Sequence, residues 1–440
     1  MSKYNKGIII AEGKTKCIYQ VVEDRGLVIV ENKSTITAHD DPSLTREFAT
    51  KAEYATTTTC RVFEFLRDCG IPVAYQEQLS PTSFVARKSD MISLEIVARR
   101  YAVGSYLKRH PDLITTDLKK PKRFHRLLVE FFLKTSGREY VIPIVHGVNQ
   151  CGNVFSLPCD DPLIVDPMAK VWQFAHPKKP SWEEDSLIPS PVLGSECQED
   201  LLKGLDITLL EKLVRQVTLA LEKGWGLLGL DFIDVKIECD TLGVSDVIDG
   251  DSWRLWKNGE GYDKQLFRDK GEDVLSEVEA RYGYIARMSE RLQVPKQVLV
   301  VWRGSGKDVV PEVSEVGGLD IIKVSMSKHK NTVQVLSCLE QIMADYPQGG
   351  VIVAIVGRSN GLGPILATHS PWPVVSSPTT MGEFPEDIFS SLRMPSNVPM
   401  MTAWPSTNAI DAALTILGQT NPAAYVHMQM KREDQDDYID

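Results

Sequence analysis

The stretch VPKQVLVVW, residues 294–302, divides this sequence into two parts with different patterns. VLVVW is a short continuous apolar run, which is typical of a strand buried on both faces inside a parallel sheet. After it, IIKV (321–324), VIVAIV (351–356) and WPVVS (372–376) alternate with loops or helical stretches. This alternation predicts a three-layer α/β domain over residues 297–425, with helices on both faces of a parallel sheet.

The part before this stretch, residues 1–292, has the mixed pattern of an α+β domain. Short β-rich runs open it and predict an antiparallel meander: GIII (7–10), KCIYQVV (16–22) and LVIVEN (27–32). Three helices are predicted after the meander: over about 46–69, after a capping box formed by Thr208 and Glu211, and over about 274–292.

Two segments fall outside these patterns. Residues 135–187 are rich in Pro, Gly, Asn and Asp with only scattered strand-like runs, so we interpret them as an elaboration of the first domain that could act as a lid. Residues 426–440 are interpreted as an acidic tail.

Composition excludes several classes of function. The 440 residues carry a net charge of −10, which argues against a general nucleic-acid-binding surface. The eight cysteines form no CxxC pair, and no apolar run is long enough for a signal peptide or a membrane span. The sequence therefore predicts a cytoplasmic protein that binds neither nucleic acid nor membranes.

Acidic side chains are concentrated in FIDVKIECDTLGVSDVIDGDSWRLW, residues 232–256. In a strand, Asp234, Lys236 and Glu238 would share one face, and the turn that follows would return the chain toward Asp246. A hairpin of this kind could hold the Glu238 and Asp246 carboxylates side by side. Two oxygen ligands suit Mg²⁺ when water and nucleotide phosphates supply the others. The alternative is an ordinary hairpin with one solvated face.

The amino-terminal EGKTK (12–16) offers charge to balance nucleotide phosphates. Lys14 and Lys16 would lie on the same face if the second strand begins there. The segment lacks the spacing of a P-loop, so these lysines would act from a β-hairpin.

Basic residues also gather in MISLEIVARRYAVGSYLKR (91–109). Arg99, followed by a Gly turn and Ser105, could bind a sugar phosphate. The alternative is a solvated basic helix face, above all for Lys108 and Arg109.

Together these motifs resemble the ATP-dependent ligase SAICAR synthetase. The matching segments are EGKTK, ARRYAVGSYLKR (98–109), VKIE with SDVIDGDSWRLW (235–256), and DKQLFRD (263–269). The second part resembles AIR carboxylase, which in animals is fused after the synthetase, and GRSNGLGP (357–364) closely resembles the signature loop of the animal-type enzyme. The resemblance implies an α+β synthetase-like domain followed by a flavodoxin-like carboxylase domain.

This resemblance implies two consecutive steps of de novo purine synthesis. The carboxylase would add CO₂ to an aminoimidazole ribotide without biotin or a metal. The synthetase would then couple the new carboxylate to the amine of aspartate, using ATP and Mg²⁺. The implied partners are aminoimidazole ribotides, aspartate and CO₂ or bicarbonate, within a homo-oligomer that is an octamer in this family.

By matching position, the resemblance also implies roles for residues of the ligase. Lys14 and Lys16 would hold ATP phosphates and act in catalysis, and Glu95 would lie near the adenine. Glu238 and Asp246 would hold Mg²⁺. Arg99, Ser105 and Arg254 would bind the ribotide phosphate, and Asp251 would contact the substrate or the incoming amine.

In the carboxylase, His329 would transfer a proton at the ring carbon; as a lone histidine after a strand, it could instead be an ordinary surface residue. The substrate would be bound by Ser305, Asp308, Lys330, Gly357, Arg358, Ser359, Asn360 and Gly361. Lys307 and Lys328 depart from the family pattern and would change the charge of this pocket. The stretch from Asp308 to His329 is short, which predicts a stunted first helix.

Two other functions fit the same sequence. A divergent paralogue could join another carboxylate or amine and keep its carboxylase domain only for assembly. A catalytically idle scaffold is the second alternative, and the intact Lys14, Glu238, Asp246 and Arg254 argue against it.

Overall fold

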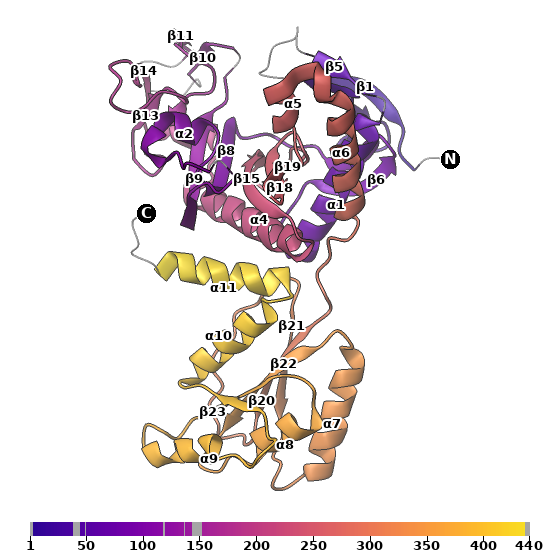
Figure 1. The fold of residues 1–440 in the computed structure, drawn as a ribbon, viewed down its shortest axis with the longest axis vertical. Helices are drawn as coiled ribbons and strands as arrows, with labels where there is room; N and C mark the ends of the chain where they lie inside the picture. The colour runs from indigo at the N-terminus through magenta and orange to yellow at the C-terminus, as the bar shows by residue number, and fades with distance from the viewer. Residues whose placement is uncertain are drawn as a thin grey trace. The chain divides into compact units, whose positions relative to one another are not determined.

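The computed structural model describes residues 3–37, 45–48, 50–117, 119–135, 137–142 and 152–435. These residues form two compact units (Figure 1). Of the described residues, the first unit comprises those up to residue 67 together with Ile71–Leu292, and the second comprises 68–70 and 293–435. None of the described helices combines the length and apolarity needed to cross a membrane.

The first unit opens with a five-stranded antiparallel sheet in the order β1-β2-β3-β7-β6. Its first three strands form the meander that the sequence predicts. Its strands are β1 (Lys6–Glu12), β2 (Lys16–Val21), β3 (Leu27–Asn32), β6 (Tyr75–Ser80) and β7 (Ser83–Arg87).

The first helix begins later than predicted. α1 spans Lys51–Asp68, whereas the sequence predicted a start near residue 46. Residues Thr45–Glu47 instead form β5, which pairs with β4 (Thr35–Thr37). Helical periodicity could not show this pairing, because the partner strand lies outside the helical window.

A second, eight-stranded antiparallel sheet follows in the order β14-β13-β12-β9-β8-β15-β18-β19. α4 (Ile207–Leu227) packs on β15, β8 and β9. Its N-cap is Asp206, whose carboxylate accepts a hydrogen bond from the backbone of Thr208, so the predicted Thr208–Glu211 capping box was wrong. The strands are β8 (Leu94–Tyr101), β9 (Arg123–Leu133), β12 (Leu163–Ile164), β13 (Trp172–Ala175), β14 (Leu187–Leu193), β15 (Asp231–Ile237), β18 (Trp253–Lys257) and β19 (Glu260–Gly261).

The described part of residues 135–187 contains regular structure. β10 (Glu139–Val141) pairs with β11 (Val154–Ser156), while β12 and β13 extend the eight-stranded sheet. Residues 136 and 143–151 lie outside the described part of the chain. The described part of the elaboration therefore lies largely at one edge of the eight-stranded sheet.

Short elements complete the first unit. The helix predicted over about 274–292 is α6 (Leu275–Ser289), and its Val278 and Tyr282 pack with Ile36, Phe48 and Phe267. The remaining elements are α2 (Ser105–Arg109), η2 (Pro111–Leu113), α3 (Ser195–Leu201), β16 (Cys239–Asp240), β17 (Gly243–Val244), α5 (Gln265–Lys270) and η3 (Gly271–Val274).

The second unit confirms the predicted α/β architecture. Its five strands are parallel, in the order β21-β20-β22-β23-β24. β24 was not predicted from the sequence; it is short and lies at the edge of the sheet. The strands are β20 (Val298–Arg303), β21 (Asp320–Ser325), β22 (Gly350–Val356), β23 (Val374–Pro378) and β24 (Met400–Thr402).

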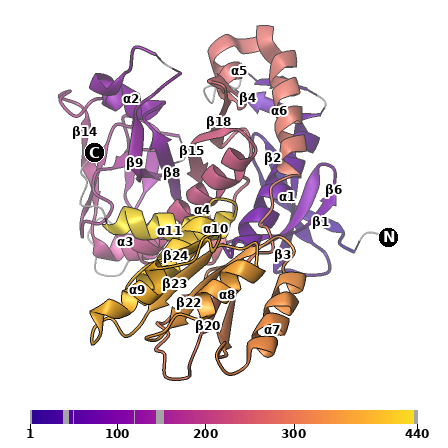
Figure 2. The same ribbon diagram turned by 60° about the horizontal axis from the view of Figure 1, so that its bottom comes forward.

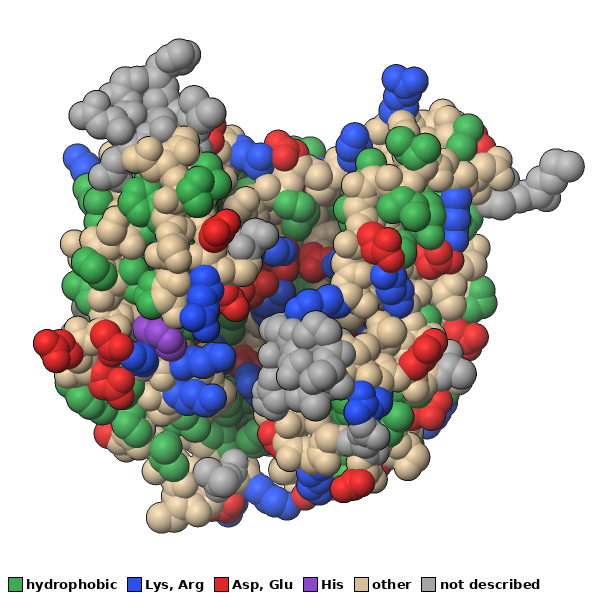
Figure 3. All heavy atoms as spheres, turned by 90° about the horizontal axis from the view of Figure 1, so that it is seen from above, with side chains coloured by type: hydrophobic (Ala, Val, Ile, Leu, Met, Phe, Trp, Pro, Cys, Tyr) green, Lys and Arg blue, Asp and Glu red, His purple; other side chains and the backbone are tan. Residues whose placement is uncertain are grey.

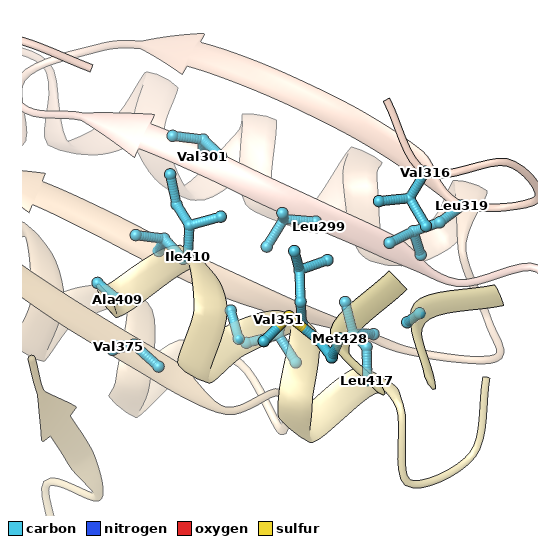
Figure 4. Packing of buried hydrophobic residues seen from close by; sticks show 14 of the residues in the cluster. Leu299, Val301, Val316, Leu319, Val351, Val375, Ala409, Ile410, Leu417 and Met428 are labelled. Atoms are coloured by element: carbon cyan, nitrogen blue, oxygen red, sulfur yellow. The ribbon is translucent and has the colours of Figure 1, made fainter. Parts of the chain in front are cut away.

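Helices lie against the parallel sheet of the second unit (Figure 2). Alternate residues of the central strands are buried against different helices. Val298, Val300 and Trp302 face α7 (Thr332–Asp345) and α8 (Leu362–His369). Leu299 and Val301 face α10 (Ser406–Leu417) and α11 (Pro422–Gln435), as Figure 4 shows. Between β23 and β24 lie η4 (Pro385–Ile388) and α9 (Phe389–Leu392).

Two expectations about the second unit need correction. No helix forms in the segment between β20 and β21, every residue of which is described. The chain there is irregular. Its Val316 and Leu319 pack on the same face of the sheet as α10 and α11. The predicted stunted helix is thus replaced by irregular chain. Residues 426–435 are not a tail, because α11 continues through them and buries Val426, Met428 and Met430.

Candidate functional site

A polar cavity of about 640 Å³ lies within the first unit, between its two large sheets. Residues from the β1–β2 turn, β8, β15 and the loop that leads into β18 line it. Figure 3 shows this face hollowed, with Lys, Arg, Asp and Glu side chains gathered inside the hollow. A cavity with so many ionisable groups is suited to a highly charged ligand.

β15 and the residue that follows it supply acids and a lysine to the cavity, because side chains alternate along a strand. Asp234, Lys236 and Glu238 line it, while Val235 and Ile237 are buried in the core on the other side. Lys236 Nζ lies 2.8 Å from Glu95 Oε1 and 2.8 Å from Glu238 Oε1. Glu95, at the start of β8, therefore lies among the charged groups of the cavity.

Glu238 is an ionised carboxylate held close to cations. Its side chain is 6% exposed and accepts hydrogen bonds from Lys236 and Lys134. Burial opposes ionisation, but the charges of the two lysines outweigh it and lower the pKa of Glu238 to about 2. The carboxylate is thus charged at every physiological pH.

The β16–β17 hairpin brings Asp246 back to the cavity that Glu238 lines. The backbone N–H groups of Ser245 and Asp246 donate to the Glu238 carbonyl, at 3.1 and 3.4 Å. The Asp246 carboxylate accepts a hydrogen bond from Lys16. Among the described residues no group of three or more His, Cys, Asp or Glu side chains is arranged as a metal site. Two carboxylates nevertheless fit Mg²⁺, which keeps several waters and takes phosphate oxygens as further ligands.

The β1–β2 turn places Lys14 and Lys16 on the cavity wall together. Burial lowers the pKa of Lys16 to about 8, against the opposing charge of Glu238. A lysine with this pKa is still mostly protonated at neutral pH, so it can neutralise phosphate oxygens.

Arg99, Ser105 and Arg254 also meet in the cavity. Arg99 Nη2 donates to Ser105 Oγ at 3.1 Å, and Arg99 is otherwise held by buried ion pairs with Glu130 and Asp234. Arg254 Nη1 lies 2.5 Å from Asp234 Oδ2. Of the two guanidinium groups, Arg254 is the more exposed and Arg99 is almost wholly enclosed by acids.

The loop between β17 and β18 carries two acids with different surroundings. Asp251 Oδ2 lies 3.0 Å from Lys51 Nζ, and Asp251 Oδ1 accepts a hydrogen bond from the Tyr282 hydroxyl at 2.7 Å. Burial opposes ionisation of Asp251, but Lys51 and Lys264 outweigh it and hold the pKa of Asp251 well below its usual value. Asp249 lines the same cavity and has neither of these partners.

Lys51 was not predicted as a site residue, although the sequence carries a signal for it. Lys51 falls at helical spacing with Ala55 and Val62, on the face of α1 that is buried. A lysine there needs a buried acid, because an unpaired charge in the core is costly. Lys264 and Arg268, which line the cavity, lie in the DKQLFRD motif but were given no role of their own, and no local pattern marked Lys134, which contacts Glu238.

The second unit has a separate pocket of about 410 Å³ at the carboxyl ends of β20, β21 and β22. This edge of a parallel sheet is where ligands bind in α/β folds. Ser305 and Asp308 follow β20, His329 and Lys330 follow β21, and Gly357, Arg358 and Ser359 follow β22; all of them line the pocket. Burial raises the pKa of Asp308.

Three residues of this region differ from the expectation. Asn360 does not line the pocket: its Nδ2 donates to Ser376 Oγ at 3.0 Å and to Ser391 Oγ at 2.9 Å, which fixes the loop. Gly361 does not line the pocket either; its backbone packs closely against the His329 ring. Of the two unexpected lysines, Lys328 lines the pocket and Lys307 does not.

Two family profiles match the chain. The SAICAR synthetase profile matches residues 9–140 and 191–283, and the AIR carboxylase profile matches residues 312–438. The gap between the two parts of the synthetase match, residues 141–190, contains most of the elaboration over residues 135–187.

Curated relatives match nearly the whole chain. The "Probable multifunctional protein ADE2" of Caenorhabditis elegans is 32% identical over 94% of this chain and 90% of its own length. The "Bifunctional phosphoribosylaminoimidazole carboxylase/phosphoribosylaminoimidazole succinocarboxamide synthetase" of Homo sapiens is 28% identical over 95% of this chain and 91% of its own.

Among solved structures, the phosphoribosylaminoimidazole-succinocarboxamide synthase of Ehrlichia chaffeensis covers 64% of this chain and 99% of its own, at 20% identity and a TM-score of 0.45. The two profiles and the full-length relatives together identify the chain. It belongs to the SAICAR synthetase family and carries an AIR carboxylase domain fused after the synthetase in one polypeptide.

Proposed function

We propose that the first unit joins aspartate to carboxyaminoimidazole ribotide with ATP and Mg²⁺, and that the second unit makes this ribotide from aminoimidazole ribotide and CO₂. The observation that carries the proposal is the convergence of Lys14, Lys16, Glu238, Asp246 and Arg254 in one cavity. Family membership supplies the identity of the substrates.

In the ligase reaction, an oxygen of the ribotide carboxylate attacks the γ-phosphorus of ATP and ADP leaves. This step is needed because a carboxylate is a poor acyl donor until it is phosphorylated. Lys14 and Lys16 offset the negative charge of the phosphates, while Arg254 and Ser105 bind the ribotide phosphate. Arg99 is held by Glu130 and Asp234 and orients Ser105 through its 3.1 Å hydrogen bond.

In the second half of the reaction, the amine of aspartate attacks the acyl carbon and inorganic phosphate leaves. Glu238 and Asp246 would hold Mg²⁺, which when bound stabilises the charge on the transferring phosphoryl group. Lys236 donates hydrogen bonds to both Glu238 and Glu95 and fixes them in position. No covalent enzyme intermediate is required.

In the carboxylase, Ser305, Asp308 and the backbone that begins at Gly357 would bind the ribotide, and His329 would move the proton at the ring carbon. Lys328 and Lys330 add positive charge beside His329, which favours a phosphorylated, carboxylated ligand. The reaction in this proposal uses no biotin. A homo-oligomeric state and a cytoplasmic location belong to the same proposal and rest on the family.

Two assays test the proposal. ADP release is measured with ATP, Mg²⁺, carboxyaminoimidazole ribotide and aspartate, with aspartate omitted as the control. Carboxylation of aminoimidazole ribotide is followed with bicarbonate present or absent. Lack of aspartate-dependent ADP release would contradict the ligase, and lack of bicarbonate-dependent product would contradict the carboxylase.

A further inference from the structure

Two neighbouring acids of the ligase cavity, Asp249 and Asp251, are held in different ways. Both oxygens of Asp251 are engaged, one by Lys51 Nζ at 3.0 Å and the other by the Tyr282 hydroxyl at 2.7 Å. Hydrogen bonds from a cation and a hydroxyl to its two oxygens stabilise the ionised form of Asp251 and make it a weak base. Asp251 therefore positions Lys51 and Tyr282 and is poorly suited to proton transfer.

Asp249 lines the cavity as Asp251 does, but only one of its carboxylate oxygens has a described partner. It is 3% exposed and lines the cavity. Its Oδ1 accepts the backbone N–H of Asp251 at 2.9 Å, and no other described residue donates a hydrogen bond to its carboxylate. The Ser252 hydroxyl bonds both the N–H and the carbonyl of Asp249, at 2.9 and 3.0 Å, which fixes the loop. The second carboxylate oxygen is thus fixed in place without a protein partner among the described residues.

The ligase reaction needs such a group. The amine of aspartate is an ammonium ion at neutral pH, and an ammonium nitrogen has no lone pair for attack. We propose that Asp249 is the general base that accepts a proton from this ammonium, an inference that rests on the proposed ligase function.

The ammonium N–H bond breaks and its proton moves to Asp249. The released lone pair forms the bond to the acyl carbon, and the bond between that carbon and the phosphate oxygen breaks with its electrons on phosphate. The second proton that the nitrogen must lose to become an amide leaves with the phosphate. Asp249 then returns its proton to water.

The electrostatics of the site support this role. Burial, followed by the charge of Asp251, raises the pKa of Asp249 to about 6, while Lys51 and Lys16 oppose the shift. A carboxylate with this pKa is ionised at neutral pH but is a stronger base than an ordinary aspartate. The charged and titratable groups that act on it come from its own loop, α1, β2 and α6: Asp251, Lys51, Lys16 and Tyr282.

The test compares two nucleophiles on the Asp249→Asn variant. Hydroxylamine is largely unprotonated above neutral pH, so it attacks an acyl phosphate without needing a base. At pH 7.5 and saturating amine, we expect the variant to lose about 100-fold or more of kcat with aspartate. ADP release and hydroxamate formation with hydroxylamine should stay close to wild type. Asp249→Glu, which keeps a carboxylate, should recover part of the aspartate rate.

The pH profile gives a second measurement that does not depend on the variant's stability. Because the ionised base is the active form, wild-type kcat at saturating aspartate should fall as the pH decreases through about 6. Melting temperatures with and without Mg-ADP show whether Asp249→Asn is folded and binds nucleotide.

Three outcomes would overturn the inference: an unchanged aspartate rate in Asp249→Asn, an equal loss with both nucleophiles, or a wild-type kcat that is flat across pH 6. A wild-type protein that reacts with hydroxylamine but never with aspartate would instead overturn the proposed function, and the inference with it. The wild-type and variant assays therefore separate the two failures.

Discussion

A Cβ atom on Gly361 would lie 2.6 Å from Cε1 of His329. The glycine thus allows the imidazole to pack directly on the backbone of the loop after β22. Gly361 has a φ of −91°, which any residue can adopt, so its small size is needed for the His329 ring and not for the backbone.

Gly361→Ala is expected to displace the His329 ring while leaving the fold intact. Carboxylation should fall by roughly 10- to 100-fold, because a small misplacement of a catalytic group is costly. The rate of product formation from aminoimidazole ribotide and bicarbonate measures this loss of carboxylation. Gly382→Ala is the control, since nothing lies within 4 Å of the added methyl group. Equal rates in the two variants would show that the position of His329 is unimportant.

Gly104→Ala is expected to weaken ribotide binding by the ligase. Gly104 has a φ of +63°, and its added Cβ would lie 2.6 Å from Arg254 Nη2. Displacing this guanidinium should raise the KM for the ribotide roughly tenfold or more. Gly204→Ala carries a similar backbone strain, at φ +76°, but has no neighbour within 4 Å. If steady-state kinetics show the same KM for both variants, Arg254 does not bind the ribotide.

Lys51→Met is expected to destabilise the first unit. Lys51 is 2% exposed, and its loss leaves Asp251 buried without its cation. Breaking such a pair costs about 3–5 kcal/mol. Lys119→Met removes an exposed ion pair with Glu260 and should cost at most about 1 kcal/mol. Denaturant unfolding of both variants measures the difference; similar costs would contradict the buried pair.

Glu238→Gln is expected to reduce aspartate-dependent ADP release by roughly 100-fold or more, since it removes a charged Mg²⁺ ligand. Glu260→Gln, at an exposed position outside the cavity, should leave the rate unchanged. A Glu238→Gln enzyme with wild-type dependence on Mg²⁺ would exclude this residue from the metal site.

The ionisation of Glu238 also predicts a pH dependence of stability. Its pKa is lowered from 4.5 to about 2 in the folded protein, so its contribution to the free energy of unfolding is present above pH 4.5. That contribution should be lost as the pH falls through about 2. The difference in unfolding free energy between wild type and Glu238→Gln should therefore shrink between pH 5 and pH 2, as measured by denaturant titration.

Much of this molecule could be predicted from local sequence. The apolar run after residue 297 predicts parallel strands because a buried strand needs apolar residues on both faces. Alternation along β15 predicts that Lys236 and Glu238 share a face because the side-chain period of a strand is fixed by its backbone. These signals lie within a few residues of one another, and tertiary packing did not override them.

Other features depended on residues far apart in the chain. Lys16 meets Asp246 across 230 positions, and Lys51 meets Asp251 across 200. Which lysine pairs with which acid follows from how the sheets and α1 pack, and periodicity carries no such information. The same packing engages both carboxylate oxygens of Asp251 and only one of Asp249, although the two acids are only two positions apart. Local sequence thus determined which side chains were available to the site, and tertiary structure decided their partners, because an ion pair forms only where the fold brings its two charges within reach.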